Sequence, residues 1–191
     1  MPTFTIVARP NGSGKSTLTK WNREALQDAP ILDPDAISRT SQADSGAIDA
    51  SDFDAARVIL LKAEELLDAR QSFTVETTLS GKTYLKMAKR AKLLGYVVRL
   101  FFVGTSNVGI NIERVRERVL RGGHDIPLAD QLRRYPRSFE NMKALFAIAD
   151  YASLYDNSGI PGYVPIATKT PNSRAFVKPH PEWASFLLDR P

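Results

Sequence analysis

The segment at residues 8–17 reads Ala8-Arg9-Pro10-Asn11-Gly12-Ser13-Gly14-Lys15-Ser16-Thr17 and directly follows the apolar run Phe4–Val7. A β-branched strand, a glycine-rich turn and a Gly-Lys-Ser-Thr sequence that opens a helix are the context of a nucleoside-triphosphate P-loop. Gly12 and Gly14 lack a Cβ, so the backbone there can adopt positive φ and turn its N–H groups toward a phosphate. The segment predicts a phosphate-binding loop; the alternative is a solvated Gly/Ser turn that precedes a lysine.

Each residue type in this loop has a chemical reason to be there. Lys15 supplies positive charge for the β- and γ-phosphates, and the Ser16 hydroxyl is a ligand for Mg²⁺. The residues predicted to bind ATP in the loop are Pro10, Asn11, Gly12, Ser13, Gly14, Lys15, Ser16 and Thr17. The full pattern G-x-x-x-x-G-K-[ST] has glycine where this chain has Arg9. This departure bears on the geometry of the loop and on its affinity for a nucleotide.

The composition limits the kinds of protein this chain can be. Its 191 residues suffice for one domain, residues 1–191, with a core that needs no disulfides. With no cysteine and 2 histidines, the sequence excludes disulfides and thiolate metal sites and argues against a histidine-rich metal site. No apolar run approaches the roughly 20 residues of a membrane span, and no secretory signal pattern opens the chain. We therefore expect a cytoplasmic protein without a membrane partner.

The net charge of +5 suits an anionic partner. A nucleic acid is one such partner, and a nucleotide is another. Because the basic residues cluster in one segment, nucleic acid binding is kept only as an alternative to nucleotide binding.

Strand and helix patterns alternate along the first half of the chain. The expected elements are a helix from Lys15 to about Leu26, a short strand Ile31–Leu32, a helix from about Asp52 to Ala69 with a capping box at Ser51–Asp54, a strand Ser72–Val75, a helix Lys82–Leu94 ended by Gly95, and a strand Tyr96–Val103. Such alternation implies right-handed βαβ crossovers in a three-layer α/β/α sandwich.

The last part of the chain predicts further strands and a short helix. Tyr151–Tyr155 is interpreted as a fifth strand, and Val164–Thr168 as one more. Proline cannot donate to a β-ladder, so Pro165 predicts that this last strand lies at an edge of the sheet. The segment Pro181–Asp189 is expected to form a short helix whose two aromatic side chains pack onto the body of the protein.

Polar residues follow two of the predicted strands. Asp33 and Asp35 leave the strand after the P-loop helix, where a carboxylate could deprotonate a phosphoryl acceptor or hold a Mg²⁺-bound water. The alternative is that one of them caps the next turn. Glu76, Thr77 and Thr78 end the following strand and would reach the same crevice if the sheet is parallel. They predict substrate recognition, against the alternative of a solvated strand end.

Two predicted helices in the middle of the chain carry many arginines. These are Arg114, Arg118 and Arg121 on the helix from about Val108 to Arg121, and Arg133, Arg134 and Arg137 on a second helix that Pro136 should break or kink. Joined by the Gly122-Gly123 loop, the helices predict a lid that closes over bound phosphates. The alternative is that the arginines form surface ion pairs with neighbouring glutamates.

The ordered set of these motifs resembles the zeta-toxin family, and within it the compact bacterial branch. The motifs are Pro10-Asn11-Gly12-Ser13-Gly14-Lys15-Ser16-Thr17, Asp33-Pro34-Asp35, Glu76-Thr77-Thr78-Leu79-Ser80, Arg118-Val119 with Gly122-Gly123-His124-Asp125, and Tyr155-Asp156-Asn157-Ser158. The resemblance runs roughly from Phe4 to Thr168. It implies an adenylate-kinase-like P-loop kinase with a mostly parallel five-stranded core sheet and an arginine-bearing helical lid.

The resemblance also implies an activity and a partner. Zeta toxins use ATP and Mg²⁺ to phosphorylate the 3′-hydroxyl of the amino sugar in UDP-N-acetylglucosamine, and a protein antitoxin occludes their nucleotide site. The implied site residues are Lys15 on the phosphates, Ser16 on Mg²⁺, Asp35 as the base, Arg118 with Arg133 or Arg134 on the γ-phosphate, and Glu76, Thr77, Thr78 and Arg121 toward the substrate. A nucleotide sugar is thus the expected substrate.

Two other functions stay open from the sequence. The net positive charge is consistent with an RNA-directed kinase. Arg9, in place of the P-loop glycine, is consistent with a nucleotide-regulated binding protein without catalysis. Neither accounts for Asp35, Glu76 and the arginine helices together as well as a small-molecule kinase does.

Overall fold

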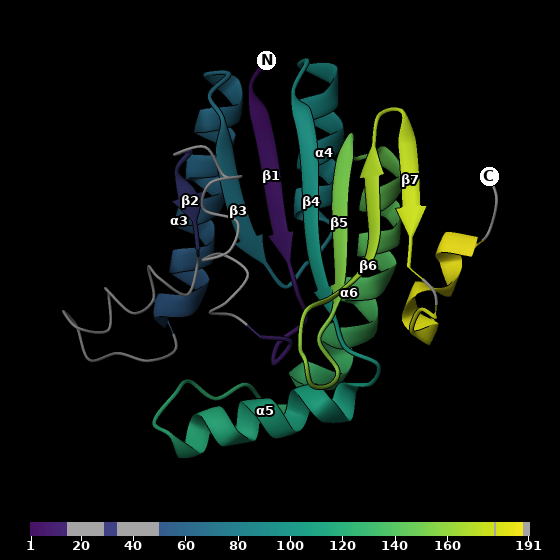
Figure 1. Cartoon of the computed structure of the whole chain (residues 1–191). Coiled ribbons are helices and arrows are strands. Elements are labelled where there is room, and N and C mark those ends of the chain that lie inside the picture. Colours follow the sequence, from purple (N-terminus) through teal and green to yellow (C-terminus); the bar gives the residue numbers. More distant parts are fainter. Residues whose placement is uncertain (15–28, 34–49, 178, 189–191) are drawn as a thin grey trace.

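The computed structural model describes residues 1–14, 29–33, 50–177 and 179–188, and the side chains of these residues except those of 50–55 and 188. Within this part of the chain a seven-stranded sheet runs in the order β2-β3-β1-β4-β5-β6-β7 (Figure 1). The strands are β1 (Thr3–Ala8), β2 (Ile31–Leu32), β3 (Phe73–Thr77), β4 (Val97–Gly104), β5 (Tyr151–Asp156), β6 (Val164–Thr170) and β7 (Ser173–Phe176).

The first five strands of this order confirm the predicted parallel core. Strands β2, β3, β1, β4 and β5 pair in parallel, while β6 and β7 pair antiparallel and extend the sheet beyond β5. Strand β1 lies at the centre of these five parallel strands, and its run Phe4–Ala8 is buried throughout, as expected where both faces of a strand are covered. The fold is therefore mixed α/β with a central, mostly parallel sheet, as predicted.

The helices are α3 (Ala50–Asp68), α4 (Thr83–Leu93), α5 (Val108–Leu120) and α6 (Leu128–Ile148), with a 3₁₀ helix η2 (Glu182–Leu188) near the C-terminus. Helices α4 and α6 pack side by side against the central strands, and α5 lies across the carboxyl ends of the strands (Figure 1). The predicted helix from Lys15 to about Leu26 lies outside the described residues.

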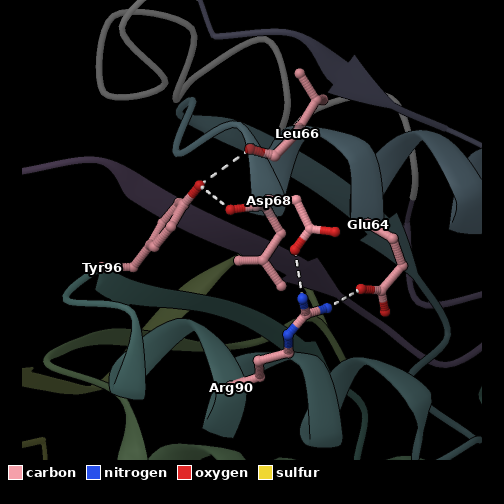
Figure 2. Close-up of polar contacts among 6 residues, drawn as sticks. Glu64, Leu66, Asp68, Arg90 and Tyr96 are labelled. Carbon is pink, nitrogen blue, oxygen red and sulfur yellow. Dashed lines mark hydrogen bonds and ion pairs between the residues drawn. The ribbon is translucent and has the colours of Figure 1, made fainter.

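Two contacts join the C-terminal half of α3 to its neighbours (Figure 2). The Tyr96 hydroxyl lies 3.1 Å from the carbonyl oxygens of Leu66 and Leu67 and 3.0 Å from that of Gln71, so it satisfies acceptors at the end of the helix. On the exposed side of the same helix, Arg90 of α4 forms ion pairs with Glu64 and Asp68. The first contact is buried, and the second faces solvent.

The ends of two helices test the capping predictions. Gly95 has φ +78° and its N–H donates to Lys92 O at 3.0 Å, which confirms the predicted C-terminal end of α4. The capping box at Ser51 is wrong, because Ala50 is already helical and Ser51 therefore lies inside α3.

Both proline predictions need correction. Helix α6 continues through Pro136 from Leu128 to Ile148, so the predicted break is wrong, while the predicted kink stays a prediction. A proline costs roughly 3 kcal/mol in a helix interior, but the turns that follow bury Phe139, Met142, Leu145 and Phe146 in the core, and this burial outweighs the loss. Strand β6 is not an edge strand, since β7 covers it. Pro165 is tolerated because it sits beside an irregularity in the β5 pairing and precedes the segment Ala167–Thr170 that pairs with β7.

The predicted C-terminal helix is confirmed as η2. Its Trp183 ring packs against Phe102 and Phe139, with centroids 5.9 Å and 5.4 Å away, and Phe186 packs edge-on against Phe146. Residues at the end of the chain therefore cover part of the core.

Candidate functional site

The candidate site lies at the carboxyl ends of the parallel strands. In register, Ala8 at the end of β1 is flanked by Thr77 at the end of β3 and by Phe102 in β4. The P-loop therefore leaves the sheet from its central strand, between the ends of its neighbours. This is the edge at which open α/β sheets bind ligands, and the prediction that the end of β3 shares it with the P-loop is confirmed.

The described part of the P-loop has the backbone that its glycines predict. Gly12 has φ +79° and Gly14 has φ +100°. A Cβ at Gly12 would lie 2.4 Å from the Asn111 carbonyl oxygen, and a Cβ at Gly14 would lie 2.5 Å from the Tyr163 hydroxyl. Both positions therefore require glycine for backbone conformation, and Gly12 also requires it for space, because its neighbour there is backbone. Lys15, Ser16 and Thr17 lie outside the described residues.

A buried polar cluster holds the loop from two sides. The Asn111 amide of α5 donates to Ser13 Oγ at 3.0 Å and to the Asn11 carbonyl, and its oxygen accepts from Thr105. From the end of β5, the Asn157 amide donates to the Ser13 carbonyl at 2.7 Å. We call Ser13, Thr105, Asn111 and Asn157 the loop clamp.

No motif in the sequence indicated the loop clamp. Asn111 lies one helical turn before Val115, and both are buried on the inner face of α5. A polar residue at a core-facing position of an amphipathic helix was the available signal, because buried polar groups need partners. Tyr135 of α6 adds to this region by donating to the Thr105 carbonyl at 2.6 Å. Burial raises the pKa of Tyr135.

The side chain of Arg9 is turned into the protein and forms an ion pair with Glu76. Arg9 is 8% exposed and Glu76 is 6% exposed. The P-loop residue that departs from the full pattern thus contacts the glutamate predicted to bind substrate. Neither the pattern of the P-loop nor that of β3 indicated this pairing.

The other predicted substrate residues at this edge have local contacts. The Thr77 hydroxyl accepts from the Leu79 N–H at 2.9 Å, and the Thr78 hydroxyl lies 3.1 Å from that of Ser80. Both threonines therefore shape the turn after β3. Asp33 follows the short strand β2 and is partly buried, whereas Asp35 lies outside the described residues.

The predicted lid is built as two joined helices, and most of its predicted arginines have protein partners. Arg114 donates to the Asn157 carbonyl at 2.7 Å, and Arg118 donates to the His124 carbonyl at 2.7 Å. Helix α5 is thus tied to the loop clamp at its first half and to the Gly122–Asp125 loop at its second. Arg121 is exposed at the end of α5.

Arg133 and Arg134 both pair with Asp130 on the surface of α6. The hydrogen bond from Arg133, with the charge of Arg134, holds the pKa of Asp130 below its usual value. These pairs join the arginines to an aspartate of their own helix and not to the glutamates of the ion-pair alternative, and exposed pairs of this kind contribute little to stability.

The described part of the chain shows neither a metal-binding cluster nor a membrane-spanning helix. Among residues 1–14, 29–33, 50–177 and 179–188, no three His, Cys, Asp or Glu side chains form a cluster that could hold a metal. In the same part of the chain, no helix has the length and apolar character that crossing a membrane requires.

Comparison with known proteins gives the family. The model of the Zeta toxin family matches residues 1–160 of this chain. The chain belongs to the Zeta toxin family. A relative in Haemophilus influenzae, named only as an uncharacterized protein, is 35% identical over 116 residues, which are 61% of this chain and 80% of that protein.

Solved structures confirm the fold of this zeta-toxin family member. The AvrRxo1-ORF1:AvrRxo1-ORF2 complex with ATP aligns with a TM-score of 0.72 at 14% identity, over 98% of this chain and 62% of that chain. The chain thus spans less than two thirds of that similar structure. The PezAT chromosomal toxin–antitoxin system of Streptococcus pneumoniae aligns with a TM-score of 0.58 at 19% identity, over 81% of this chain and 68% of that chain.

Proposed function

We propose that this protein is an ATP-dependent kinase that transfers the γ-phosphate to a hydroxyl of a small substrate, and that the substrate is a nucleotide sugar such as UDP-N-acetylglucosamine. The observation that carries the proposal is the P-loop backbone, with Gly12 and Gly14 at positive φ at the carboxyl end of the central strand. Membership of the Zeta toxin family supports the same reaction class. The buried Glu76 beside the loop supports binding of the acceptor, in addition to the nucleotide, at this edge of the sheet.

The proposed chemistry assigns one task to each predicted residue. Asp35 accepts the proton of the acceptor hydroxyl as its oxygen attacks the γ-phosphorus, and the bond from that phosphorus to ADP breaks. Lys15 neutralises charge on the phosphates, as does Arg118 with Arg133 or Arg134. Glu76, Thr77, Thr78 and Arg121 orient the acceptor.

Mg²⁺ is proposed as the metal that accompanies ATP. Membership of the Zeta toxin family supports ATP as the phosphoryl donor, and a P-loop holds the accompanying ion through one Ser or Thr hydroxyl together with phosphate oxygens. Ser16 would supply that hydroxyl. Bound there, Mg²⁺ would offset negative charge on the phosphates.

A protein antitoxin is the proposed partner, and the cytoplasm, where ATP is available, the proposed location. Support for the partner comes from the family and from the similarity to a structure named as a toxin–antitoxin system. An antitoxin that covers the P-loop edge would protect the cell that makes the kinase.

The test is transfer of labelled γ-phosphate from ATP and Mg²⁺ to UDP-N-acetylglucosamine, with other nucleotide sugars, free sugars and RNA oligomers in parallel. We expect label on the nucleotide sugar and none with the Lys15→Ala variant. Label on RNA alone would instead establish a nucleic-acid kinase. Tight ATP binding without transfer to any acceptor would establish a binding protein and overturn the proposal.

A further inference from the structure

Arg9 occupies the first position of the P-loop pattern without needing the backbone freedom of glycine. It is not among the residues with positive φ, and its N–H donates to the Thr77 carbonyl at 3.0 Å. The backbone at position 9 therefore continues the pairing between β1 and β3. Because the backbone accepts any residue here, the reason for arginine must lie in its side chain.

The Arg9 guanidinium is buried and only partly satisfied. Its Nη2 pairs with Glu76 Oε2, and the side chains are 9% and 7% exposed. Its Nη1 is buried and has no hydrogen-bond partner among the described residues. A buried donor left unpaired costs about 1–3 kcal/mol. Stability does not explain this arrangement, because burying a pair of charges is favourable only when their remaining donors are also satisfied.

The place of Arg9 indicates which ligand would satisfy Nη1. Arg9 is held against β3, and Glu76, which is proposed to contact the acceptor, lies in the same strand one residue before its end. Glu76 already neutralises the guanidinium charge. A second anion at Nη1 would have to share the single positive charge of Arg9 with the buried Glu76 carboxylate, whereas a neutral oxygen would not.

We propose that Arg9 is an acceptor-binding residue whose Nη1 donates a hydrogen bond to a neutral oxygen of the acceptor, a hydroxyl or an amide carbonyl, while Glu76 fixes the guanidinium. This inference rests on the proposed kinase function and adds a specificity element to it. On this proposal, arginine stands in place of the P-loop glycine because its guanidinium binds the acceptor and not the nucleotide.

The test compares ligand binding by the wild type with that of an Arg9→Lys variant. Lysine keeps the positive charge opposite Glu76 but lacks the fixed second amino group of the guanidinium. We expect Arg9→Lys to weaken binding of UDP-N-acetylglucosamine about tenfold, as expected for loss of roughly 1.4 kcal/mol, and to raise its KM similarly in the transfer assay. Affinities for ATP and for UDP, measured by calorimetry, should stay within about threefold.

The exposed Arg116 of α5 provides a matched control, since Arg116→Lys should change none of these constants. Arg9→Gly, which restores the full P-loop pattern, should reproduce the effect of Arg9→Lys with a melting transition retained. Equal weakening of UDP with unchanged binding of uridine would show that the guanidinium binds a phosphate and would overturn the neutral-oxygen assignment. Loss of ATP affinity would place Arg9 in the nucleotide site and overturn the proposal.

Failure of this inference and failure of the proposed function give different results. A wild type that phosphorylates the nucleotide sugar, with Arg9→Lys leaving the acceptor KM unchanged, overturns the role of Arg9 alone. A wild type that phosphorylates no acceptor overturns the kinase proposal and this inference with it.

Discussion

Gly12 is the residue at which both the backbone conformation and the packing require glycine. At φ +79°, with the Asn111 carbonyl oxygen 2.4 Å from where a Cβ would be, it has no room for a side chain. We predict that Gly12→Ala lowers ATP affinity at least tenfold and destabilises the protein by about 1–3 kcal/mol, a range typical of strained backbone positions. Calorimetric titration with ATP and urea unfolding measure the two effects.

Gly81→Ala is the control for this substitution. Gly81 has no positive φ, and no heavy atom lies within 4 Å of where its Cβ would be. The Gly81→Ala variant should leave ATP affinity and the midpoint of urea unfolding unchanged. If Gly12→Ala binds ATP like the wild type, the described loop conformation is not the one that binds nucleotide.

Asn111 couples α5 to the P-loop, and its removal should affect stability and ligand binding together. Asn111→Ala leaves the Asn11 carbonyl and the Thr105 hydroxyl without their buried partner, at a cost of about 1–3 kcal/mol. We also expect weaker ATP binding, because Ser13 loses a contact that fixes the loop. Urea unfolding and ATP titration give both values.

The Asn107→Ala variant distinguishes the effect of losing the loop clamp from the effect of destabilising α5. Asn107 caps the same helix by accepting from the Ile110 N–H at 3.2 Å. Its loss should cost about 0.5–2 kcal/mol of stability, as for other N-caps, but should not change ATP affinity. An equal loss of ATP affinity in both variants would mean that α5 acts through its stability and not through the clamp.

At the residue scale, the sequence predicted those features that a local motif determines. Gly12 and Gly14 followed from the spacing of the P-loop, because phosphate-binding turns need positive φ. The ion pair of Arg9 with Glu76 did not follow, since it joins residues 67 positions apart and depends on strand register. The roles proposed for Lys15, Ser16 and Asp35 stay predictions from motif and family.

Among the helices, α3 offers a comparison between a buried and an exposed contact (Figure 2). The buried Tyr96 hydroxyl lies against carbonyls at the end of α3, whereas Arg90 bridges two carboxylates in solvent. We predict that Tyr96→Phe costs about 1–3 kcal/mol because acceptors lose their buried donor. Arg90→Ala should cost only about 0–1 kcal/mol. Urea unfolding measures both changes.

Salt concentration distinguishes the two contacts further. The small cost of Arg90→Ala should shrink as salt is raised, since exposed charges are screened. The cost of Tyr96→Phe should not change. A larger loss for Arg90→Ala than for Tyr96→Phe would show that the exposed pairs hold α3 in place.

At the element scale, type and order were predictable and the effects of prolines were not. Strands β1, β3 and β4 were predicted from runs of β-branched and aromatic residues, and α4 from its cap at Gly95. Pro136 and Pro165 were misjudged because local rules omit tertiary context. Burial of the turns after Pro136 stabilises α6, and β7 lies where an edge was predicted.

Across the whole molecule, the segment that identifies the family is shorter than the fold. The family match ends at residue 160, but β6, β7 and η2 follow it. Ile166 and Ala167 of β6, and Ala184 and Leu187 near the C-terminus, are buried in the core. We therefore propose that residues 1–191 fold as one unit.

A chain truncated after residue 160 tests this proposal. Truncation removes the pairing partner of β5 and the aromatic cover that Trp183 places on Phe102. An unpaired, largely buried strand becomes an exposed edge, and such edges promote aggregation. We predict that residues 1–160 show no cooperative thermal unfolding and no ATP binding.

Trp183→Phe in the full chain separates loss of the whole segment from loss of one contact. Phenylalanine keeps an aromatic ring on the core but cannot donate to Asp156, which accepts from the Trp183 indole at 2.9 Å. The expected cost is about 0.5–1.5 kcal/mol, the net value of one hydrogen bond, with ATP binding retained. If the truncated chain instead unfolds cooperatively and binds ATP, the family segment is a complete folding unit, and β6, β7 and η2 are an addition to it.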